Sequence, residues 1–532
     1  MHRLLRGIDP VVFYGSSAAA TAFVLWGVLG TDSLGSVMQS VLDWVIRNFG
    51  WAFVLIAISA LLFCIVLAIS PYGRIRLGPD DSRPEFRTVS WIAMMFAAGL
   101  GLGLLFYGVA EPISHFAAPP HGLAEPRSQE AAQLALETTY FHWGFNGWAI
   151  YAVMGLALAY FTFRKGGRNL VSATFAPLLG ERASERPIGR LIDGLAIFAT
   201  LFGTATSLGL GALQINSGLN FLWDVPTTNA IAVVIIVVIT ALFVLSAVSG
   251  VERGIQFLSN VSGGATVALM VFFLLVGPTV FIISTAIETI GGYVIRLFPM
   301  SFRTGAFGDS DWMAAWTIFY WAWWISWAPF VGTFVARISR GRTIREFILG
   351  VVAAPTGMGF VWFAIVGATG IDLQTSGQAD LIGTTATPEL SLFTALEQLP
   401  LTTVVSIVAL ILIAFFFISG ADAASVVMAM LASRGLLEPA RFVTAIMGCL
   451  MGAIASALLL VGGLTALQQG AVLASVPFTF VIVGIGWSMI KVLRGERVPA
   501  REPLEVPVAA APGPAVGPGT FAPDSLEGES SR

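Results

Sequence analysis

Long apolar stretches alternate with short polar segments along nearly the whole chain. The hydrocarbon core of a bilayer is about 30 Å thick, so a helix that crosses it needs about 20 mostly apolar residues. Windows of this kind occur at residues 10–30, 50–70, 89–110, 137–163, 188–222, 227–247, 258–284, 313–337, 345–369, 401–431, 440–463 and 474–492. The pattern predicts an all-α polytopic membrane protein with 12 transmembrane helices.

Positive charge is distributed unevenly between the segments that join these windows. If both termini face the cytoplasm, Arg47, Arg127, Arg296 and Arg303 fall in outer segments, and the other 24 of the 28 Lys and Arg residues fall in inner ones. Short cytoplasmic loops of membrane proteins carry an excess of Lys and Arg. The distribution therefore supports the predicted spans and places both termini in the cytoplasm.

The composition excludes a soluble globular protein, because 56% of the residues are hydrophobic and 11% are charged. The two cysteines, Cys64 and Cys449, both fall in apolar windows, and the four histidines are scattered. We find no phosphate-binding loop, no nucleophile elbow and no metal-ligand spacing. We therefore expect that the protein is not an enzyme and binds no cofactor. If it moves a solute uphill, the energy must come from an ion gradient.

Residues 320–330 read YWAWWISWAPF, and this run contains four of the 15 tryptophans of the chain. It begins several residues inside an apolar window, whereas tryptophans normally collect at the membrane interface. Several aromatic faces in a dry cavity attract a quaternary ammonium, which cannot form hydrogen bonds. The run predicts an aromatic box for such a cation, and ordinary packing combined with an interfacial belt is the alternative.

The third window contains Gly99, Gly101 and Gly103 at alternate positions. Each glycine costs a helix about 1 kcal/mol relative to alanine. In secondary transporters a stretch of this kind marks a helix that is unwound near the middle of the membrane, where free backbone groups face a binding cavity. Close helix packing through Gly99 and Gly103 is the alternative.

Three motifs resemble the betaine/carnitine/choline transporter family, and the resemblance extends from about Pro10 to about Lys491. They are WAWWISWAPFVGTFVARISRGRTIREF over residues 321–347, MMFAAGLGLG over residues 94–103 followed by Glu111-Pro112, and His142-Trp143-Gly144 followed by WAIY over residues 148–151. The resemblance implies a secondary transporter that imports a trimethylammonium or similar onium zwitterion across a bacterial cytoplasmic membrane. It also implies a homotrimer surrounded by lipid, with no nucleic acid partner.

The implied architecture is a LeuT-like core of two inverted five-helix repeats. In this chain the first repeat covers spans 3–7 (residues 89–284) and the second covers spans 8–12 (residues 313–492), separated by a periplasmic segment at 285–312. A short cytoplasmic tail (1–9) and two peripheral spans with their loop (10–88) precede the core. The segment 493–532 is rich in Pro, Ala and Gly and then acidic, which predicts a disordered cytoplasmic tail.

The resemblance implies that Trp143, Trp148, Tyr151 and Trp324 form the aromatic box. Trp148 and Tyr151 are three residues apart, so they share one face of a helix. Trp323 and Trp327 resemble the aromatic lining of the cytoplasmic part of the pathway and are expected to act as a gate.

The carboxylate of a zwitterion needs donors, and no Lys or Arg lies at this depth in spans 3, 4 or 8. We expect backbone amides around Ala98, Gly99, Gly101 and Gly103 to supply them. Choline carriers of the family carry aspartate where this chain has Gly103. The absence of this aspartate favours a substrate with its own carboxylate, such as glycine betaine, over choline.

The sodium-dependent members imply two ion sites, with Na⁺ as the coupling ion. One maps onto Thr200, Thr204 and Phe330, although a threonine in a helix also bonds its own i−4 carbonyl. The other maps onto Ala97, Leu100, Phe416, Ser419 and Gly420. Here the sodium-coupled members have Thr-Ser, so Gly420 removes one hydroxyl, and weaker sodium affinity is expected.

Other interpretations stay open at this stage. Proton coupling would use Asp422, Glu111 or a Glu137/His142 pair, because ionisable groups within the membrane are functional candidates. Thr206 and Ser207 are possible pathway residues. A substrate/product antiporter is the further alternative, and carnitine, ectoine and dimethylsulfoniopropionate are alternative substrates.

Overall fold

The computed structural model describes residues 7–99, 101–120, 122–249 and 252–498. The regular structure in these ranges is helical, apart from one isolated β-bridge between Arg76 and Thr343. Nine of the described helices are long and apolar enough to cross a membrane. The all-helical membrane class expected from the sequence is therefore present, whereas the count of 12 spans and the inverted repeat stay predictions.

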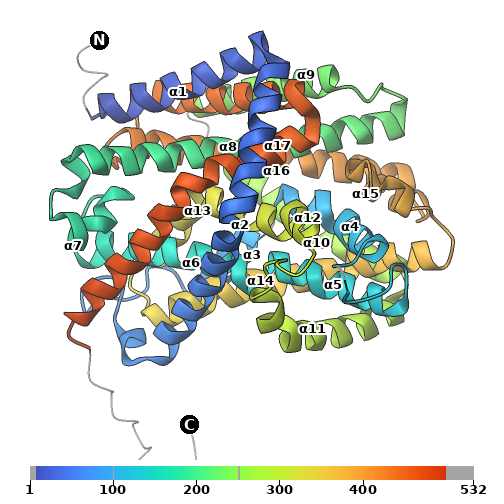
Figure 1. The fold of residues 1–532 in the computed structure, drawn as a ribbon, viewed down its shortest axis with the longest axis horizontal. Helices are drawn as coiled ribbons and strands as arrows, with labels where there is room; N and C mark the ends of the chain where they lie inside the picture. The colour runs from blue at the N-terminus through green and yellow to red at the C-terminus, as the bar shows by residue number, and fades with distance from the viewer. Residues whose placement is uncertain (1–6, 100, 121, 250–251, 499–532) are drawn as a thin grey trace, which may run out of the picture.

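The longer helices occupy most of the described chain. They are α1 (Pro10–Leu29), α2 (Thr31–Ile69), α3 (Thr88–Gly99), α4 (Leu102–Ala117), α5 (Gln129–Trp143), α6 (Phe145–Ala159), α8 (Pro187–Trp223), α9 (Asn229–Ser249), α10 (Glu252–Val276), α11 (Thr279–Ser301), α13 (Phe319–Arg337), α14 (Ile344–Thr375), α16 (Thr402–Ala432) and α17 (Arg441–Arg494). The shorter ones are α7 (Ala176–Leu179), α12 (Ser310–Met313) and α15 (Ser391–Glu397). Many of these helices run across Figure 1 from side to side, and α2 crosses in front of them.

Several helix bounds differ from the apolar windows. Helix α2 begins at Thr31 rather than at residue 50, because its polar and charged first half, with Asp43 and Arg47, still forms helix but lowers the local hydropathy. The window at 258–284 is interrupted at Gly277-Pro278. Helix α11 begins inside this window at Thr279 and continues to Ser301, in the segment expected to lie outside. A proline has no N–H to continue a helix, which explains the break at Pro278.

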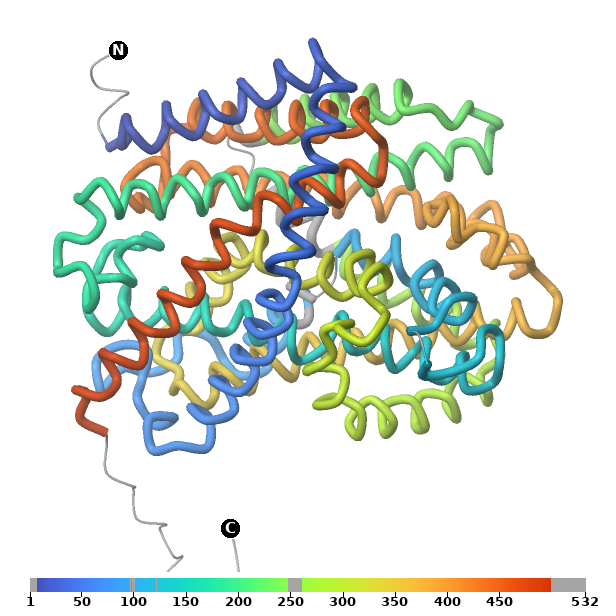
Figure 2. Tube along the Cα trace, in the orientation of Figure 1, coloured from blue at the N-terminus to red at the C-terminus, as the bar shows by residue number. Residues whose placement is uncertain are grey.

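The last two windows form one element that folds back on itself. Within α17 the backbone leaves helical geometry at Gly462 (φ −171°) and Gly463 (φ 60°, ψ −138°). The positive φ at Gly463 is in a region that only glycine adopts readily. Figure 2 shows the tube reversing direction in this element, and the second half then runs diagonally across the molecule.

Two other helices are interrupted near the centre of the molecule. Between α3 and α4 the backbone of Gly101 is extended (φ −167°, ψ 175°), as the alternating glycines predicted. Between α5 and α6 the chain breaks at Gly144 (φ −98°, ψ −144°), which the sequence analysis did not anticipate. Both interrupted helices pack around α13 and α14, since α6 contacts α13 and α4 contacts α14. The candidate site lies where these elements meet.

Candidate functional site

A cavity of about 340 Å³ lies between the interrupted helices, α13 and α16. This is at the lower end of the range usual for small-molecule sites. Its lining is mostly aromatic and aliphatic, and no Lys or Arg is among the described residues that form it. The polar side chains in the lining are Thr204, Ser207, Ser262 and Ser419.

Three aromatic rings form one corner of this cavity. Trp148 and Tyr151 come from α6, and their ring centroids are 5.4 Å apart. The ring of Trp324, from α13, lies 5.4 Å from Trp148 and 4.7 Å from Tyr151. The three side chains are 4%, 6% and 6% exposed. The structure thus brings together three of the four residues expected in the box, and we call them the aromatic corner.

Local contacts hold Trp324 in this position. Its indole N–H donates to the backbone oxygen of His142 at 3.0 Å. A Cβ built on Gly147 would lie 2.4 Å from the Trp324 ring, so the absence of a side chain there lets α6 and α13 approach closely. The indole therefore has few alternative orientations.

The fourth predicted box residue, Trp143, lies beside the corner at the end of α5. Its ring is 6.3 Å from Trp324 and 6.0 Å from Trp323, in both cases edge to face. The Trp323 N–H donates to the backbone oxygen of Gly203 at 3.3 Å. All four of Trp143, Trp323, Trp324 and Trp327 line the cavity.

The start of α4 also faces the cavity, which is lined by Gly101, Leu102 and Gly103. The first amides of a helix have no carbonyl partner within the helix and favour anions. A Cβ on Gly103 would lie 2.5 Å from Trp143 Cη2, so the glycine allows the indole to lie against the backbone. Gly99 is the last residue of α3; Leu100 lies outside the described residues, and so does the side chain of Ala98.

Both predicted sets of ion ligands reach this same cavity. Thr204 and Phe330 line it, whereas Thr200 is fully buried outside the lining. The Thr200 hydroxyl donates to Ala196 O at 2.8 Å, and the Thr204 hydroxyl donates to Thr200 O at 2.5 Å. Each hydroxyl therefore uses its proton within α8 and keeps its oxygen lone pairs for other partners.

The second predicted set lies on α3 and α16. Ala97, Phe416, Ser419 and Gly420 all line the cavity. The Ser419 hydroxyl donates to Phe416 O at 3.4 Å, and a Cβ built on Gly420 would have no neighbour within 4 Å. This wall of the cavity is therefore more open than the aromatic corner.

The two pathway candidates on α8 differ in orientation. Ser207 lines the cavity. Thr206 is fully buried and donates to Phe202 O and to Leu467 O, at 2.9 and 2.8 Å. The structure therefore places only Ser207 on the pathway side.

The proposed Glu137/His142 pair is wrong. His142 Nδ1 lies 2.7 Å from Glu111 Oε1, whereas Glu137 forms an ion pair with Arg296 at 2.8 Å. Residues five apart differ by about 140° around a helix, so Glu137 and His142 leave α5 in different directions. Asp422 is 6% exposed, and its Oδ1 has no hydrogen-bond partner in the described part of the chain.

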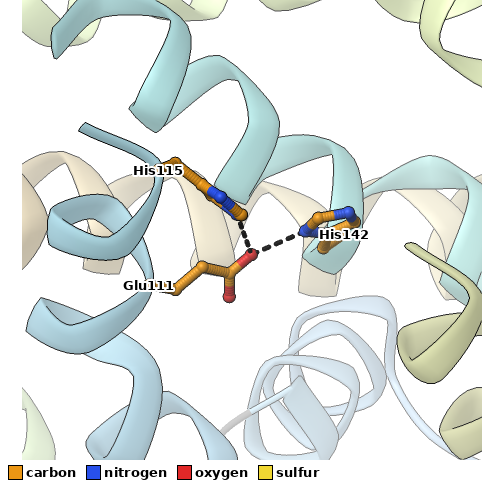
Figure 3. A group of neighbouring side chains, drawn as sticks. All are labelled: Glu111, His115 and His142. Atoms are coloured by element: carbon orange, nitrogen blue, oxygen red, sulfur yellow. Dashed lines mark hydrogen bonds and ion pairs between the residues drawn. The ribbon is translucent and has the colours of Figure 1, made fainter. Parts of the chain in front are cut away.

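A buried polar cluster surrounds Glu111. Figure 3 shows one carboxylate oxygen of Glu111 between the rings of His115 and His142. The atoms of Glu111, His115 and His142 that could bind a metal ion lie within 4.8 Å of one another, which is close enough for one ion. However, both carboxylate oxygens already accept protein hydrogen bonds, including one from Trp143 Nε1 at 2.8 Å. Glu111 and His142 are 31 residues apart in the chain, and no motif predicts that they meet.

Comparisons with known proteins place the chain in a family. Residues 11–498 match the model of the betaine/carnitine/choline family transporters. The chain is 47% identical over 497 residues to the glycine betaine transporter OpuD of Bacillus subtilis, covering 93% of this chain and 96% of the relative. It is 43% identical over 497 residues to a probable glycine betaine transporter of Desulfitobacterium hafniense, covering 92% of this chain and 99% of the relative. It is 38% identical over 493 residues to the ectoine/hydroxyectoine transporter of Virgibacillus pantothenticus, covering 92% of this chain and 98% of the relative. These matches confirm the resemblance seen in the motifs: the chain belongs to the betaine/carnitine/choline transporter family and is a membrane transporter, not an enzyme.

Proposed function

We propose that this protein imports glycine betaine or a closely similar onium zwitterion by sodium symport. The observation that carries the proposal is the aromatic corner, where Trp148, Tyr151 and Trp324 lie close together at the edge of a buried cavity. A desolvated cation gains about 2 kcal/mol or more over an indole face. The three rings offer such faces to one trimethylammonium group.

The opposite charge of the substrate has a place in the same cavity. The amides at the start of α4 are suited to a carboxylate, and the partial positive charge of the helix N-terminus adds to the attraction. Since no Lys or Arg lines the described part of the cavity, a free anion has no fixed cation to bind. These features favour a zwitterion over choline and over a simple carboxylate.

Two of the relatives cited above are named for glycine betaine and one for ectoine and hydroxyectoine. Ectoine is therefore the second candidate substrate.

Sodium coupling is proposed from hydroxyl oxygen atoms elsewhere in the lining of the same cavity. Thr204 on α8 and Ser419 on α16 come from different helices that meet at one cavity. Each belongs to one of the two predicted ion sites, and an ion bound at such a site would favour one state of a carrier with alternating access. The two inverted repeats, the 12 spans with cytoplasmic termini, the inner-membrane location and the homotrimer belong to this same proposal.

The test is uptake of radiolabelled glycine betaine into proteoliposomes in which the sodium and proton gradients are set independently. We expect saturable uptake that follows an inward sodium gradient at fixed pH and membrane potential. Uptake that ignores sodium and collapses without a proton gradient would make Asp422 and Glu111 the coupling candidates. Uptake only into vesicles preloaded with substrate would identify an antiporter.

A further inference from the structure

Glu111 carries a buried carboxylate with an unusual set of partners. Its side chain is 0% exposed, and it projects from α4 toward α5 and α13. The groups around it are four hydrogen-bond donors: His115 Nε2 at 3.3 Å, His142 Nδ1 at 2.7 Å, Trp143 Nε1 at 2.8 Å and the Tyr320 hydroxyl. A carboxylate in an apolar interior requires such donors in order to stay ionised.

The cluster around Glu111 has a net negative charge when its histidines are neutral. In the tautomer that carries its proton on Nδ1, His142 donates to Glu111, and its Nε2 accepts from the Thr317 hydroxyl at 3.0 Å. His115 donates from Nε2, and its Nδ1 has no partner among the described residues. In the described ranges, the ion-pair partners of Glu111 are these two histidines, and no Lys or Arg pairs with it. The carboxylate therefore has no permanently charged cation beside it.

This charge is connected to the aromatic residues through two links. Trp143, which lines the cavity, donates its N–H to Glu111 Oε2, so the carboxylate fixes the indole and adds electron density to it. The backbone oxygen of His142 accepts the Trp324 N–H, so the residue that faces Glu111 also anchors the aromatic corner. Glu111 therefore acts on both tryptophans without lining the cavity itself.

Glu111 lies eight residues after Gly103, which is about 12 Å along the axis of α4. The amides near Gly103 favour a negative group, whereas Glu111 favours a positive one. The helix therefore has opposite electrostatic preferences at these two positions.

We propose that Glu111 is a positioning and specificity-determining residue: it supplies the fixed negative charge that makes the site prefer a quaternary ammonium over an uncharged group of the same shape. This inference rests on the proposed function, since it assigns a role in binding the same onium substrate. Charges separated by low-dielectric protein interact far more strongly than in water.

The experiment compares glycine betaine with 3,3-dimethylbutyrate, in which a carbon replaces the quaternary nitrogen without a change of shape. The dissociation constant of each ligand is measured by calorimetry on the purified full-length protein. Wild type should prefer glycine betaine. Glu111→Gln should lower this preference roughly tenfold, whereas Glu111→Asp, which retains the charge, should keep most of it.

Glu137→Gln is the matched control, because Glu137 is a buried carboxylate on α5 that has an arginine partner, Arg296. It should leave the preference unchanged. If Glu111→Gln weakens both ligands by the same factor, Glu111 acts only through the position of Trp143 and the charge proposal is overturned. An equal loss of preference in Glu137→Gln would also contradict it.

If Glu111→Gln does not fold, His115→Lys is the second variant, because an ammonium group beside Glu111 compensates its charge and leaves the bond to Trp143 in place. The proposal predicts a reduced preference for glycine betaine, and an unchanged preference would overturn it. The failure of the proposed function would look different: wild type itself would bind neither glycine betaine nor ectoine.

Discussion

The two walls of the central cavity are built in different ways. On the aromatic wall, Trp148, Tyr151 and Trp324 lie with ring centroids 4.7–5.4 Å apart. Elsewhere in the lining, in a part that we call the hydroxyl wall, the Thr204 and Ser419 hydroxyls bond carbonyls of their own helices, and Gly420 has open space beside it. The rings of the aromatic wall are thus closely packed, and a hydrogen bond holds Trp324, whereas the hydroxyl wall has free space at Gly420.

This contrast suggests a division of labour. Preorganised rings provide affinity, because little entropy is lost when a ligand enters a fixed site. Adjustable ligands provide coupling, because binding there can change the relative stability of two conformations. Mutations on the two walls should therefore affect different measured quantities.

The largest effect is expected from Trp324→Leu. Loss of one desolvated cation–π face costs about 2 kcal/mol or more, so the affinity for glycine betaine should fall by more than about tenfold. The measurement is the substrate dependence of uptake at saturating sodium. Trp487→Leu is the control, since Trp487 is 61% exposed on α17 and lies outside the cavity lining. Near-normal affinity in the Trp324 variant would exclude the aromatic corner as the onium site.

A smaller effect on the same wall is expected from Gly103→Ala. The added methyl group would lie 2.5 Å from Trp143 and 3.1 Å from Trp323, so both indoles must move. We expect an affinity loss of roughly threefold to tenfold, in line with overpacking costs of about 1 kcal/mol or more. Gly101→Ala is a matched control on the same interrupted helix, because a Cβ at Gly101 meets nothing within 4 Å. Equal losses in the two variants would show that backbone flexibility, not the position of the rings, matters at this stretch.

The smallest effect is expected on the hydroxyl wall. Gly420→Ser adds an oxygen where space is available, and it should lower the sodium concentration for half-maximal uptake by about threefold, as expected from one added ligand worth ~0.6 kcal/mol. Ser419→Ala should raise that concentration, while the affinity for glycine betaine at saturating sodium stays unchanged. Ser425→Ala is the control, because Ser425 is fully buried on α16 and bonds Asp422 O. A loss of substrate affinity without any change in sodium dependence would reverse the roles assigned to the two walls.

The sequence predicted the aromatic residues and the broken helix because both depend on short-range patterns. Rings three residues apart share a helix face wherever the helix lies, and alternating glycines weaken a helix in any environment. The family motifs grouped Trp143, Trp148, Tyr151 and Trp324 into one box, and their proximity depends on the packing of α5, α6 and α13. Their arrangement around one cavity agrees with that expectation, although substrate binding at them stays a prediction.

Long-range features could not be predicted in the same way. Glu111 and His142 are 31 residues apart in the chain, and the four donors around the carboxylate meet only after three helices have packed. The break at Gly144 was missed because one glycine in an apolar window is common. The first half of α2 was missed because hydropathy reports contact with lipid, whereas helix formation also tolerates charged residues such as Asp43.

The central claim is that the onium group binds in the aromatic corner, and a structure of the protein with glycine betaine bound tests it most directly. The alternative location is a second cavity of about 530 Å³ lined by Gln39, Asp43 and Gln469, among others. The account predicts density for the trimethylammonium group among Trp148, Tyr151 and Trp324, with the carboxylate directed to the start of α4. Density in the second cavity, with the aromatic corner empty at saturating substrate, would contradict it.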